Sequence, residues 1–284
     1  MPELPEVETT VRGLKKTILG LTIKNIWTDL KTTDKRKVDT VANSKYFIFF
    51  KKEVINKKIK SIERRAKNIL LNLSNNKTIL IHLKMTGYLF YGKDPKIKFA
   101  HVVFSLSNKR YLVFSDMRKF GKITLLETKT IQNSKHLKNI GPEPLEKNFT
   151  YKKFEEQLKR KLNGKIKTVL MDQTIIGGIG NIYSDEILWR AGIHPERKIN
   201  KIKEIEFKKV FKVMREILIK SINLGGDSMS DYRNLSGGKG KFQFYHQAYR
   251  RTGEKCRKKN CEGIIKRKII NTRSTHFCSI HQVL

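Results

Sequence analysis

Acidic residues, cysteines and long apolar runs are all scarce in this sequence. The 284 residues include 26 Asp and Glu against 61 Lys and Arg, which gives a formal net charge of +35. No apolar run approaches the roughly 18 residues of a membrane-spanning helix, so we do not expect a membrane protein. Three cysteines are too few, and an odd number, for a disulfide framework. The start, MPELPEVE, lacks the basic and apolar segments of a signal peptide, so we expect a cytoplasmic protein.

The remaining composition is sufficient for folded domains and calls for a polyanionic partner. Hydrophobic residues make up 38% of the chain, which can fill an ordinary core and argues against a disordered basic tail. The length predicts two domains rather than one. Cations set against phosphates release condensed counterions, so the charge favours a nucleic acid. The alternative is a preference for Lys that only solvates the surface.

Apolar periodicity divides the chain into a β-rich part and a helical part. The first 15 to 20 residues form a predicted helix, whose apolar positions recur at helical spacing. Short β-branched and aromatic runs separated by turn residues fill 21–128 and predict a β-sandwich or flattened barrel. The predicted face of the first helix consists of Val7, Val11, Leu14 and Ile18.

After a connection rich in Pro and Gly (140–148), the pattern becomes helical. A glycine-rich turn, GGIGN (177–181), lies between predicted helices, and a long amphipathic helix follows it. Five glycines in 224–245 predict a mobile loop. We therefore expect an α+β protein of two domains, in which a β-sandwich with a flanking helix precedes a helical domain that ends in a β-hairpin. The predicted segments are 1–135, a linker at 136–150, 151–245 and 246–284.

All three cysteines lie near the C-terminus, in an arrangement typical of a structural metal site. Cys256 and Cys261 form one pair, and Cys278 and His281 form a second pair after sixteen intervening residues. Two such pairs supply the four corners of a Zn²⁺ tetrahedron. His276 is an alternative fourth ligand, and coincidental free thiols are the alternative to a metal. The basic segment between the pairs predicts the β-hairpin.

The N-terminus is acidic in an otherwise basic chain. Pro2 is small enough for Met1 to be removed, which would expose a secondary amine. An α-amine has a pKa of about 8 against about 10.4 for Lys, so more of it is neutral and nucleophilic. Attack on a sugar C1′ would give an iminium, with Glu3 as proton donor or acceptor. The alternative is that MPELPE only starts a helix.

The turn GGIGN gives a weaker indication of phosphate binding. Glycines allow backbone amides at a helix start to approach an anion, and Asn181 adds a side-chain donor. Similar turns also connect helices that bind nothing.

Seven stretches together resemble the formamidopyrimidine-DNA glycosylase family, in the same order along nearly the whole chain. They are PELPEVET (2–9), RRAKNILL (64–71), HLKMTG (82–87), SDMRKFG (115–121), IGPEPL (140–145), LMDQTIIGGIGNIYSDEILWRAGIHP (170–195) and RSTHFC (273–278). The resemblance implies a helix-two-turn-helix DNA-binding domain that ends in a zinc-finger β-hairpin. It also implies one structural Zn²⁺ and a monomer whose partner is duplex DNA with a damaged base.

The resemblance implies a bifunctional enzyme. An oxidised purine, such as 8-oxoguanine or a formamidopyrimidine, is flipped out of the duplex, because its C1′ is shielded inside the helix. Pro2 then attacks C1′, the base leaves, and β- and δ-elimination cut the strand. Glu3 matches the acid/base, and Lys67 matches a lysine that assists at the base and in elimination. Arg273 and Asn181 match residues that hold phosphates, and Arg273 also matches a catalytic residue that helps the second elimination.

Met85, Arg118 and Phe120 match residues that fill the gap left by the flipped base. A thioether and an aromatic ring replace lost stacking, and a guanidinium can bond the unpaired cytosine. The alternatives are that Met85 and Phe120 are core residues and that Arg118 pairs with Asp116.

The resemblance also implies further contacts. Residues 226–245 match the loop that closes over the oxidised base. The expected lesion pocket consists of Glu6, Ser228 and Tyr232. The expected DNA contacts, besides Arg118 and Asn181, are His82, His101, Lys165 and Lys167.

The chain departs from the family pattern at five points. His281 stands where the fourth ligand is usually Cys, and the first cysteine pair has four intervening residues rather than two. Phe99 replaces the first of two histidines, so that only His101 remains. Arg250 stands where Gly is usual, and the loop at 226–245 is the least family-like stretch.

Two other functions remain open from the sequence. A sister branch removes oxidised pyrimidines with a similar fold and nucleophile, but it typically begins with a PEGPE-like sequence, so PELPEVE favours the purine branch. The second alternative is a zinc-dependent DNA-binding protein without catalysis.

Overall fold

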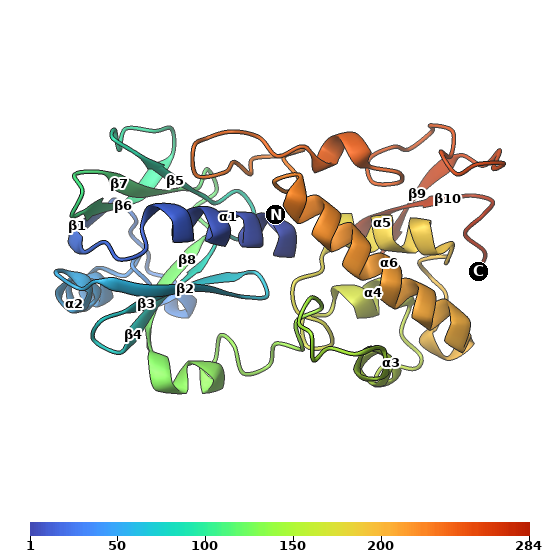
Figure 1. The fold of residues 1–284 in the computed structure, drawn as a ribbon, viewed down its shortest axis with the longest axis horizontal. Helices are drawn as coiled ribbons and strands as arrows, with labels where there is room; N and C mark the ends of the chain where they lie inside the picture. Colours follow the sequence, from blue (N-terminus) through green and yellow to red (C-terminus); the bar gives the residue numbers. More distant parts are fainter. The chain divides into compact units, whose positions relative to one another are not determined.

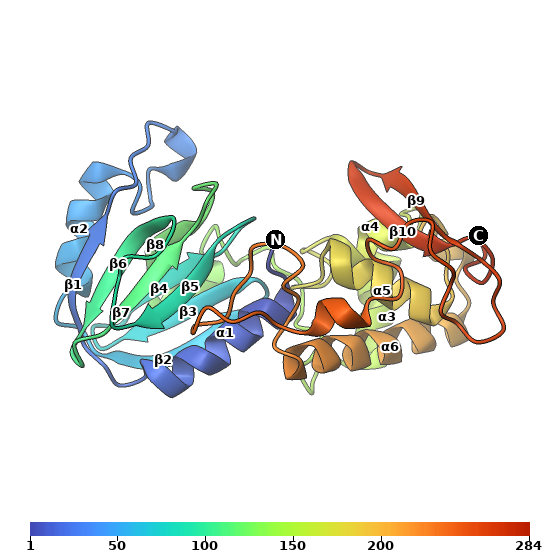
Figure 2. The ribbon, with the colours of Figure 1, turned by 90° about the horizontal axis from the view of Figure 1, so that it is seen from above.

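The computed structural model describes residues 1–284, which divide into two compact units (Figures 1 and 2). Unit 1 comprises Met1–Lys138 and Leu224–Lys241, and unit 2 comprises Asn139–Asn223 and Phe242–Leu284. The predicted boundaries placed 224–241 with the helical domain, whereas its contacts group it with unit 1. The chain therefore returns once to the first unit before it completes the second.

Unit 1 begins with helix α1 (Leu4–Thr17), as the sequence predicts. Glu3 is its N-cap, the side chain of Glu6 completes a capping box, and Pro5 lies in the first turn, where its missing N–H costs nothing. The predicted apolar face is buried, with Val7, Val11, Leu14 and Ile18 each at most 2% exposed.

Two antiparallel four-stranded sheets form the rest of unit 1. One sheet has the strand order β1-β6-β7-β5 and the other β2-β3-β4-β8. A single core joins inward side chains of both sheets with the buried face of α1, so unit 1 is a β-sandwich with a flanking helix, as predicted. The strands are β1 (Ile23–Thr28), β2 (Ile59–Arg65), β3 (Asn68–Leu73), β4 (Lys77–His82), β5 (Tyr88–Gly92), β6 (Ala100–Leu106), β7 (Tyr111–Ser115) and β8 (Lys122–Glu127).

The central strands of the second sheet explain two of the apolar runs in the sequence. β3 and β4 carry NILLNL and KTILIH, and both are buried along most of their length. A second helix, α2 (Ser44–Val54), belongs to the same unit and is capped by the side chain of Asn43. Asn68 at the start of β3 pairs with His82 at the end of β4, so the β2–β3 turn and the loop after β4 lie next to each other.

Unit 2 is helical and ends in a β-hairpin. Its helices are α3 (Tyr151–Lys159), α4 (Ile166–Met171), α5 (Asn181–Ala191) and α6 (Glu204–Asn223), and its strands are β9 (Ile265–Ile270) and β10 (Arg273–Cys278). The predicted amphipathic helix is α6, which buries Phe207, Val210, Met214, Ile217, Leu218 and Ser221. α5 ends at Gly192, whose φ of +77° gives a left-handed cap.

Four short 3-10 turns complete the secondary structure. They are η1 (Lys35–Lys37), η2 (Thr128–Asn133), η3 (Ile199–Lys201) and η4 (Phe242–Tyr245). None of the helices combines the length and the apolar character that crossing a membrane requires.

Candidate active site and metal centre

Pro2 and Glu3 lie at the start of α1, in a position that Glu6 fixes. Both residues are buried, and Glu3 is only 2% exposed. Oε2 of Glu6 accepts a hydrogen bond from the Glu3 N–H at 2.7 Å, and Oε1 accepts one from the Asp227 N–H at 2.8 Å. One carboxylate therefore joins the first turn of α1 to segment 224–241.

The three residues of the expected lesion pocket form a connected network. The Tyr232 hydroxyl donates to the Glu6 carbonyl at 3.1 Å, and the Ser228 hydroxyl donates to the Tyr232 carbonyl at 2.9 Å. Burial raises the pKa of Tyr232, so its phenol remains a donor at neutral pH. The structure thus brings Glu6, Ser228 and Tyr232 together beside Glu3. Their contact with a damaged base stays a prediction.

Lys67 is buried in the β2–β3 turn, which an ion pair fastens to α1. The Lys67 side chain is 5% exposed, and Ala66 before it has a φ of +50°. Nε of Arg64 lies 2.9 Å from Oε2 of Glu8 on α1. Burial opposes the charge of Glu8, but hydrogen bonds from Arg64 and Arg12 outweigh it and lower the pKa of this carboxyl. The turn that carries Lys67 is therefore held against α1, whose N-cap is Glu3.

His82 lies beside this turn and has a defined tautomer. Its Nδ1 accepts a hydrogen bond from the Lys84 N–H at 3.0 Å, so the ring proton resides on Nε2. Burial, together with the charges of Lys84 and Lys67, lowers the pKa of His82 to about 3. His82 therefore offers a neutral N–H donor, which suits a phosphate oxygen at any physiological pH.

The low pKa of His82 makes the stability of the protein depend on pH. In the folded state the ring stays neutral down to about pH 3, whereas an unfolded His titrates near 6.5. Between these values the unfolded state binds more protons, so the free energy of unfolding falls as the pH falls. We expect His82→Gln to reduce the loss of stability between pH 7 and pH 5 by about 1–2 kcal/mol. Urea unfolding at both pH values measures this, and an unchanged loss would contradict the low pKa.

The predicted gap-filling residues lie in two loops that Asp116 holds together. Asp116 is fully buried, and its Oδ1 accepts hydrogen bonds from the Thr86 hydroxyl and the Arg118 N–H. Its Oδ2 accepts the Gly121 N–H at 2.6 Å. The loop that follows β4 and the loop that follows β7 are therefore fixed to each other.

Both alternative interpretations of these residues are wrong. Met85 and Phe120 are 36% and 46% exposed, so they are not core side chains. Arg118 bonds Asp116 only through its backbone N–H, and its guanidinium lies 4.5 Å from the centroid of the Phe120 ring. The three side chains thus lie at the surface and are not buried in internal contacts.

His101 is less available than the sequence suggests. It lies on β6, is 6% exposed, and its Nδ1 is 2.9 Å from Oδ1 of Asp29. Its Nε2 is buried and has no hydrogen-bond partner. A DNA contact by this ring stays a prediction.

In unit 2, the glycine-rich turn places Asn181 at the first position of α5. The side chain of Gln173 holds the turn, because its Oε1 accepts the Gly178 N–H at 2.9 Å and its Nε2 donates to the Ile179 carbonyl at 2.7 Å. Gly178 has a φ of +101°, a conformation open mainly to glycine. Oδ1 of Asn181 is buried without a partner in this structure.

Lys167 differs from the expectation of a DNA contact. Its side chain is fully buried, and its ammonium binds Asp185 of α5 and the Ser274 carbonyl of β10. Asp185 also accepts hydrogen bonds from the backbone N–H and Nδ1 of His276, each at 2.9 Å. A buried ammonium in this position ties the hairpin to α5 and is not available to a phosphate.

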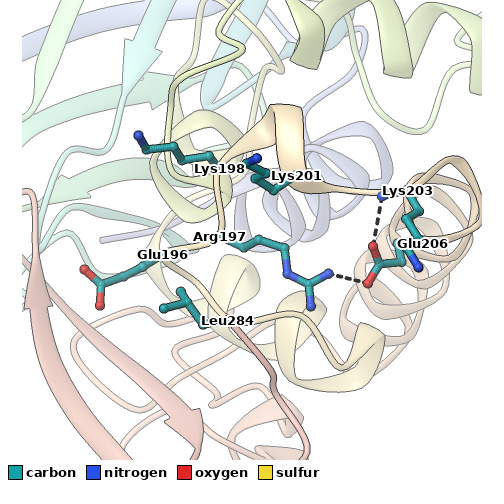
Figure 3. A pocket seen from close by; sticks show the side chains of 7 residues that line it. All are labelled: Glu196, Arg197, Lys198, Lys201, Lys203, Glu206 and Leu284. Atoms are coloured by element: carbon teal, nitrogen blue, oxygen red, sulfur yellow. Dashed lines mark hydrogen bonds and ion pairs between the residues drawn. The ribbon is translucent and has the colours of Figure 1, made fainter.

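Lys165 is also engaged within the unit. Its Nζ lies 2.6 Å from Oε1 of Glu196, and Nζ of Lys268 lies 2.5 Å from Oε2 of the same carboxylate. Hydrogen bonds from both lysines lower the pKa of Glu196. Glu196 borders an open pocket of about 690 Å³, in which Arg197 and the Lys203 N–H both bond Glu206 (Figure 3). None of the predicted site residues lines this pocket.

Arg273 lies at the tip of the β9–β10 hairpin. The two-residue turn before it, Asn271 and Thr272, has φ values of +44° and +64°, as in a type I′ turn. Arg273 pairs with Ile270 across the hairpin and is exposed. Its guanidinium is therefore presented to solvent, as a phosphate contact requires.

The four predicted metal ligands converge at the base of this hairpin. Ligand atoms of Cys256, Cys261, Cys278 and His281 all lie within 4.8 Å of one another. Nδ1 of His281 is 3.4 Å from Sγ of Cys256, and the Sγ atoms of Cys261 and Cys278 are 3.6 Å apart. Tetrahedral Zn²⁺ spaces sulfur and nitrogen ligands roughly 3.5–3.8 Å apart. The arrangement is thus one that can hold a metal ion.

His281, and not His276, is the histidine of this cluster. Nε2 of His281 donates to the Trp189 carbonyl at 2.9 Å, which leaves the Nδ1 lone pair directed at the three sulfurs. His276 is instead bound to Asp185. The alternative fourth ligand is therefore wrong. Backbone N–H groups of Lys258 and Ile280 also point to Sγ of Cys256 and Cys278, as in paired metal-binding turns.

Comparison with known proteins agrees with this geometry. Residues 1–123 match the family model of the formamidopyrimidine-DNA glycosylase N-terminal domain, and residues 140–233 match that of the formamidopyrimidine-DNA glycosylase H2TH domain. The chain belongs to the formamidopyrimidine-DNA glycosylase family. Membership places it among the DNA glycosylases and confirms the resemblance drawn from the sequence motifs.

Full-length relatives and solved structures of this family cover the whole chain. Formamidopyrimidine-DNA glycosylases of Ligilactobacillus salivarius and Pelotomaculum thermopropionicum are 40% and 39% identical, over 100% and 98% of this chain and 99% and 98% of theirs. The Lactococcus lactis enzyme in complex with DNA that contains an abasic site has a TM-score of 0.88 at 36% identity, covering 99% of this chain and 100% of that one. A mutant of that enzyme with DNA that contains a formamidopyrimidine lesion also has a TM-score of 0.88 and covers both chains fully.

The supporting roles of three buried carboxylates were not predicted from the sequence. Asp116 holds the loops that carry the predicted gap-filling residues, Asp185 holds the hairpin, and Glu186 accepts the N–H groups of three consecutive residues, 247–249. Burial raises the pKa of Glu186, and the three backbone hydrogen bonds, which lower this pKa, offset the effect only in part. The only available indication was their place within the family-like stretches SDMRKFG and NIYSDEILW.

Proposed function

We propose that this protein excises oxidised purines from duplex DNA and then cuts the strand through an iminium intermediate on Pro2. With Met1 removed, the Pro2 nitrogen is a secondary amine that can attack C1′ while the base departs. Opening of the sugar ring transfers a proton to the ring oxygen and leaves a C=N⁺ bond to Pro2. This bond acidifies C2′, so that β-elimination breaks the C3′–O bond and δ-elimination breaks the C5′–O bond.

The observation that carries the proposal is the way the start of α1 is built. Pro2 and Glu3 are held in a capped first turn, because the Glu6 carboxylate binds the Glu3 N–H at 2.7 Å. Glu3 is thereby adjacent to the nucleophile and suited to exchange the proton that attack and ring opening require. Lys67 lies in a turn fastened to the same helix by the Arg64–Glu8 pair, which supports its role in elimination.

Unit 2 supplies the expected grip on the DNA backbone. Asn181 at the start of α5 and the exposed Arg273 at the hairpin tip each offer donors to phosphates. The ligand set of three thiolates and an imidazole suits a structural Zn²⁺, which would hold the base of the hairpin closed. The two complexes of the Lactococcus lactis enzyme hold modified DNA, with an abasic site in one and a formamidopyrimidine in the other, which supports damaged DNA as the substrate.

The base preference is tested with a panel of lesions in one duplex sequence. We expect strand cutting at 8-oxoguanine and formamidopyrimidine, and at least about tenfold slower single-turnover cutting at thymine glycol, since PELPEVE favours the purine branch. The control is an abasic duplex, which either branch should cut. Faster cutting at thymine glycol than at 8-oxoguanine would assign the chain to the oxidised-pyrimidine branch.

A further inference from the structure

Four exposed apolar side chains lie in the loops around Asp116. They are Met85, Phe99, Met117 and Phe120, with exposed fractions of 36%, 41%, 50% and 46%. A cationic residue is the immediate neighbour of each along the chain, namely Lys84, Lys98, Arg118 and Lys119. Alternating cations and apolar groups on a surface suit a polyanion that also exposes bases.

Hydrogen bonds fix the Lys98–Phe99 turn to the loop that carries Arg118. The Asp116 N–H donates to the Phe99 carbonyl at 3.0 Å, and the Ser115 hydroxyl donates to the Lys98 carbonyl at 2.8 Å. Since Asp116 also binds Thr86, the turn is part of the same rigid set of loops as Met85.

The conformation of Phe99 is unfavourable for its residue type. Its φ is +58°, in the left-handed region, where an aromatic residue is rare. Lys84 and Lys119, in the two neighbouring loops, each have a φ of +54°. Such strain concentrates where a surface meets a ligand. The exposure of the Phe99 ring means that burial does not compensate for this strain.

We propose that Phe99 is a DNA-contacting residue that stacks its ring on a nucleotide beside the gap left by the extruded base. Nζ of Lys98 lies 5.0 Å from the centroid of the ring, so the ammonium can meet a phosphate flanking that nucleotide. This inference rests on the proposed function, because the gap exists only when a base has left the stack. At this position the family often has His, so the chain exchanges a hydrogen-bond donor for a stacking surface.

The test compares binding to a duplex with a tetrahydrofuran abasic analogue and to the intact duplex of the same sequence. Phe99→Gly removes the ring and relieves the left-handed strain, and Phe99→Asn removes it with a residue that tolerates this conformation. We expect both variants to bind the tetrahydrofuran duplex about tenfold more weakly, and the intact duplex within about twofold of wild type. Phe99→Trp should retain wild-type binding.

A base analogue and a matched control make the result specific. With 2-aminopurine next to the position opposite the gap, the fluorescence change on binding should be lost in Phe99→Gly and kept in Phe99→Trp. Phe49→Ala removes a ring of similar exposure, 47%, from α2 and should change neither measurement.

The outcomes separate this inference from the proposed function. Unchanged binding by Phe99→Gly and Phe99→Asn, or equal losses on both duplexes, would overturn the stacking role. A wild-type protein that forms no borohydride-trapped adduct with an abasic duplex would instead overturn the proposed function. An adduct combined with unaltered Phe99 variants would overturn only the inference about Phe99.

Discussion

Replacing Pro2 by Gly, in a protein that retains Met1, is expected to abolish the covalent adduct with DNA and to slow strand cutting by about 10³-fold or more. The nitrogen of residue 2 is then an amide, which cannot attack C1′ or carry an iminium. Incubation with an abasic duplex and borohydride, followed by denaturing electrophoresis, measures the adduct directly. Wild-type protein with a free Pro2 serves as the reference.

The matching control shows that the change affects chemistry rather than binding. The Pro2→Gly protein with Met1 retained should bind a tetrahydrofuran duplex within a few-fold of wild type, because the proposed DNA contacts of unit 2 are unchanged. An N-terminal tag in front of Pro2 should have the same effect as the substitution. An adduct that persists in both proteins would show that another amine, such as that of Lys67, is the nucleophile.

Loss of the metal centre is expected to have the second-largest effect. Cys278→Ser, or treatment with a strong chelator, should weaken DNA binding by at least about 100-fold. The pairs at Cys256 and at Cys278 lie at the base of the hairpin whose tip carries Arg273. Without a metal ion, nothing joins the two ligand pairs, and the base of the hairpin is no longer held together. Fluorescence anisotropy with a labelled duplex measures the DNA affinity, and elemental analysis of the same protein measures its metal content.

The control is His281→Cys at another ligand position. This substitution replaces one residue that binds Zn²⁺ by another and gives the commoner four-cysteine set. It should retain one metal ion per chain and near-normal binding. The β-sheet signal in circular dichroism should survive in Cys278→Ser, because the sandwich of unit 1 contains none of the ligands. Undiminished affinity in the metal-free protein would refute a role for the metal centre in DNA binding.

The parts of this structure that the sequence predicts depend on local patterns. The helix at 4–17, the buried strands and α6 follow from the spacing of apolar residues. The metal ligands were predictable because Cys256 and Cys261, and Cys278 and His281, form two pairs that are each close in the sequence. Chain spacing did not decide between His276 and His281, since both lie within three residues of Cys278. The choice depends on Asp185, which is 91 residues away along the chain and binds His276.

The parts that the sequence did not predict depend on distant partners. Lys167 looks like a surface cation in a basic chain, but Asp185 makes it an internal one. For Met85 and Phe120, composition alone left a core position open as the alternative, and the loops around Asp116 hold both side chains at the surface. In both cases a buried carboxylate, rather than a local propensity, decides the role of its neighbours.

The hydrogen bond between Glu6 and the Asp227 N–H joins residues 221 positions apart in the sequence. At a synthesis rate of roughly 5–20 residues per second, Asp227 is therefore added to the chain roughly 10–45 seconds after Glu6. The first turn of α1 thus belongs to one of the last parts of the protein to acquire its final contacts. If Met1 is removed, as the proposed mechanism requires, the removal can take place on a nascent chain, before segment 224–241 exists to contact the first turn of α1.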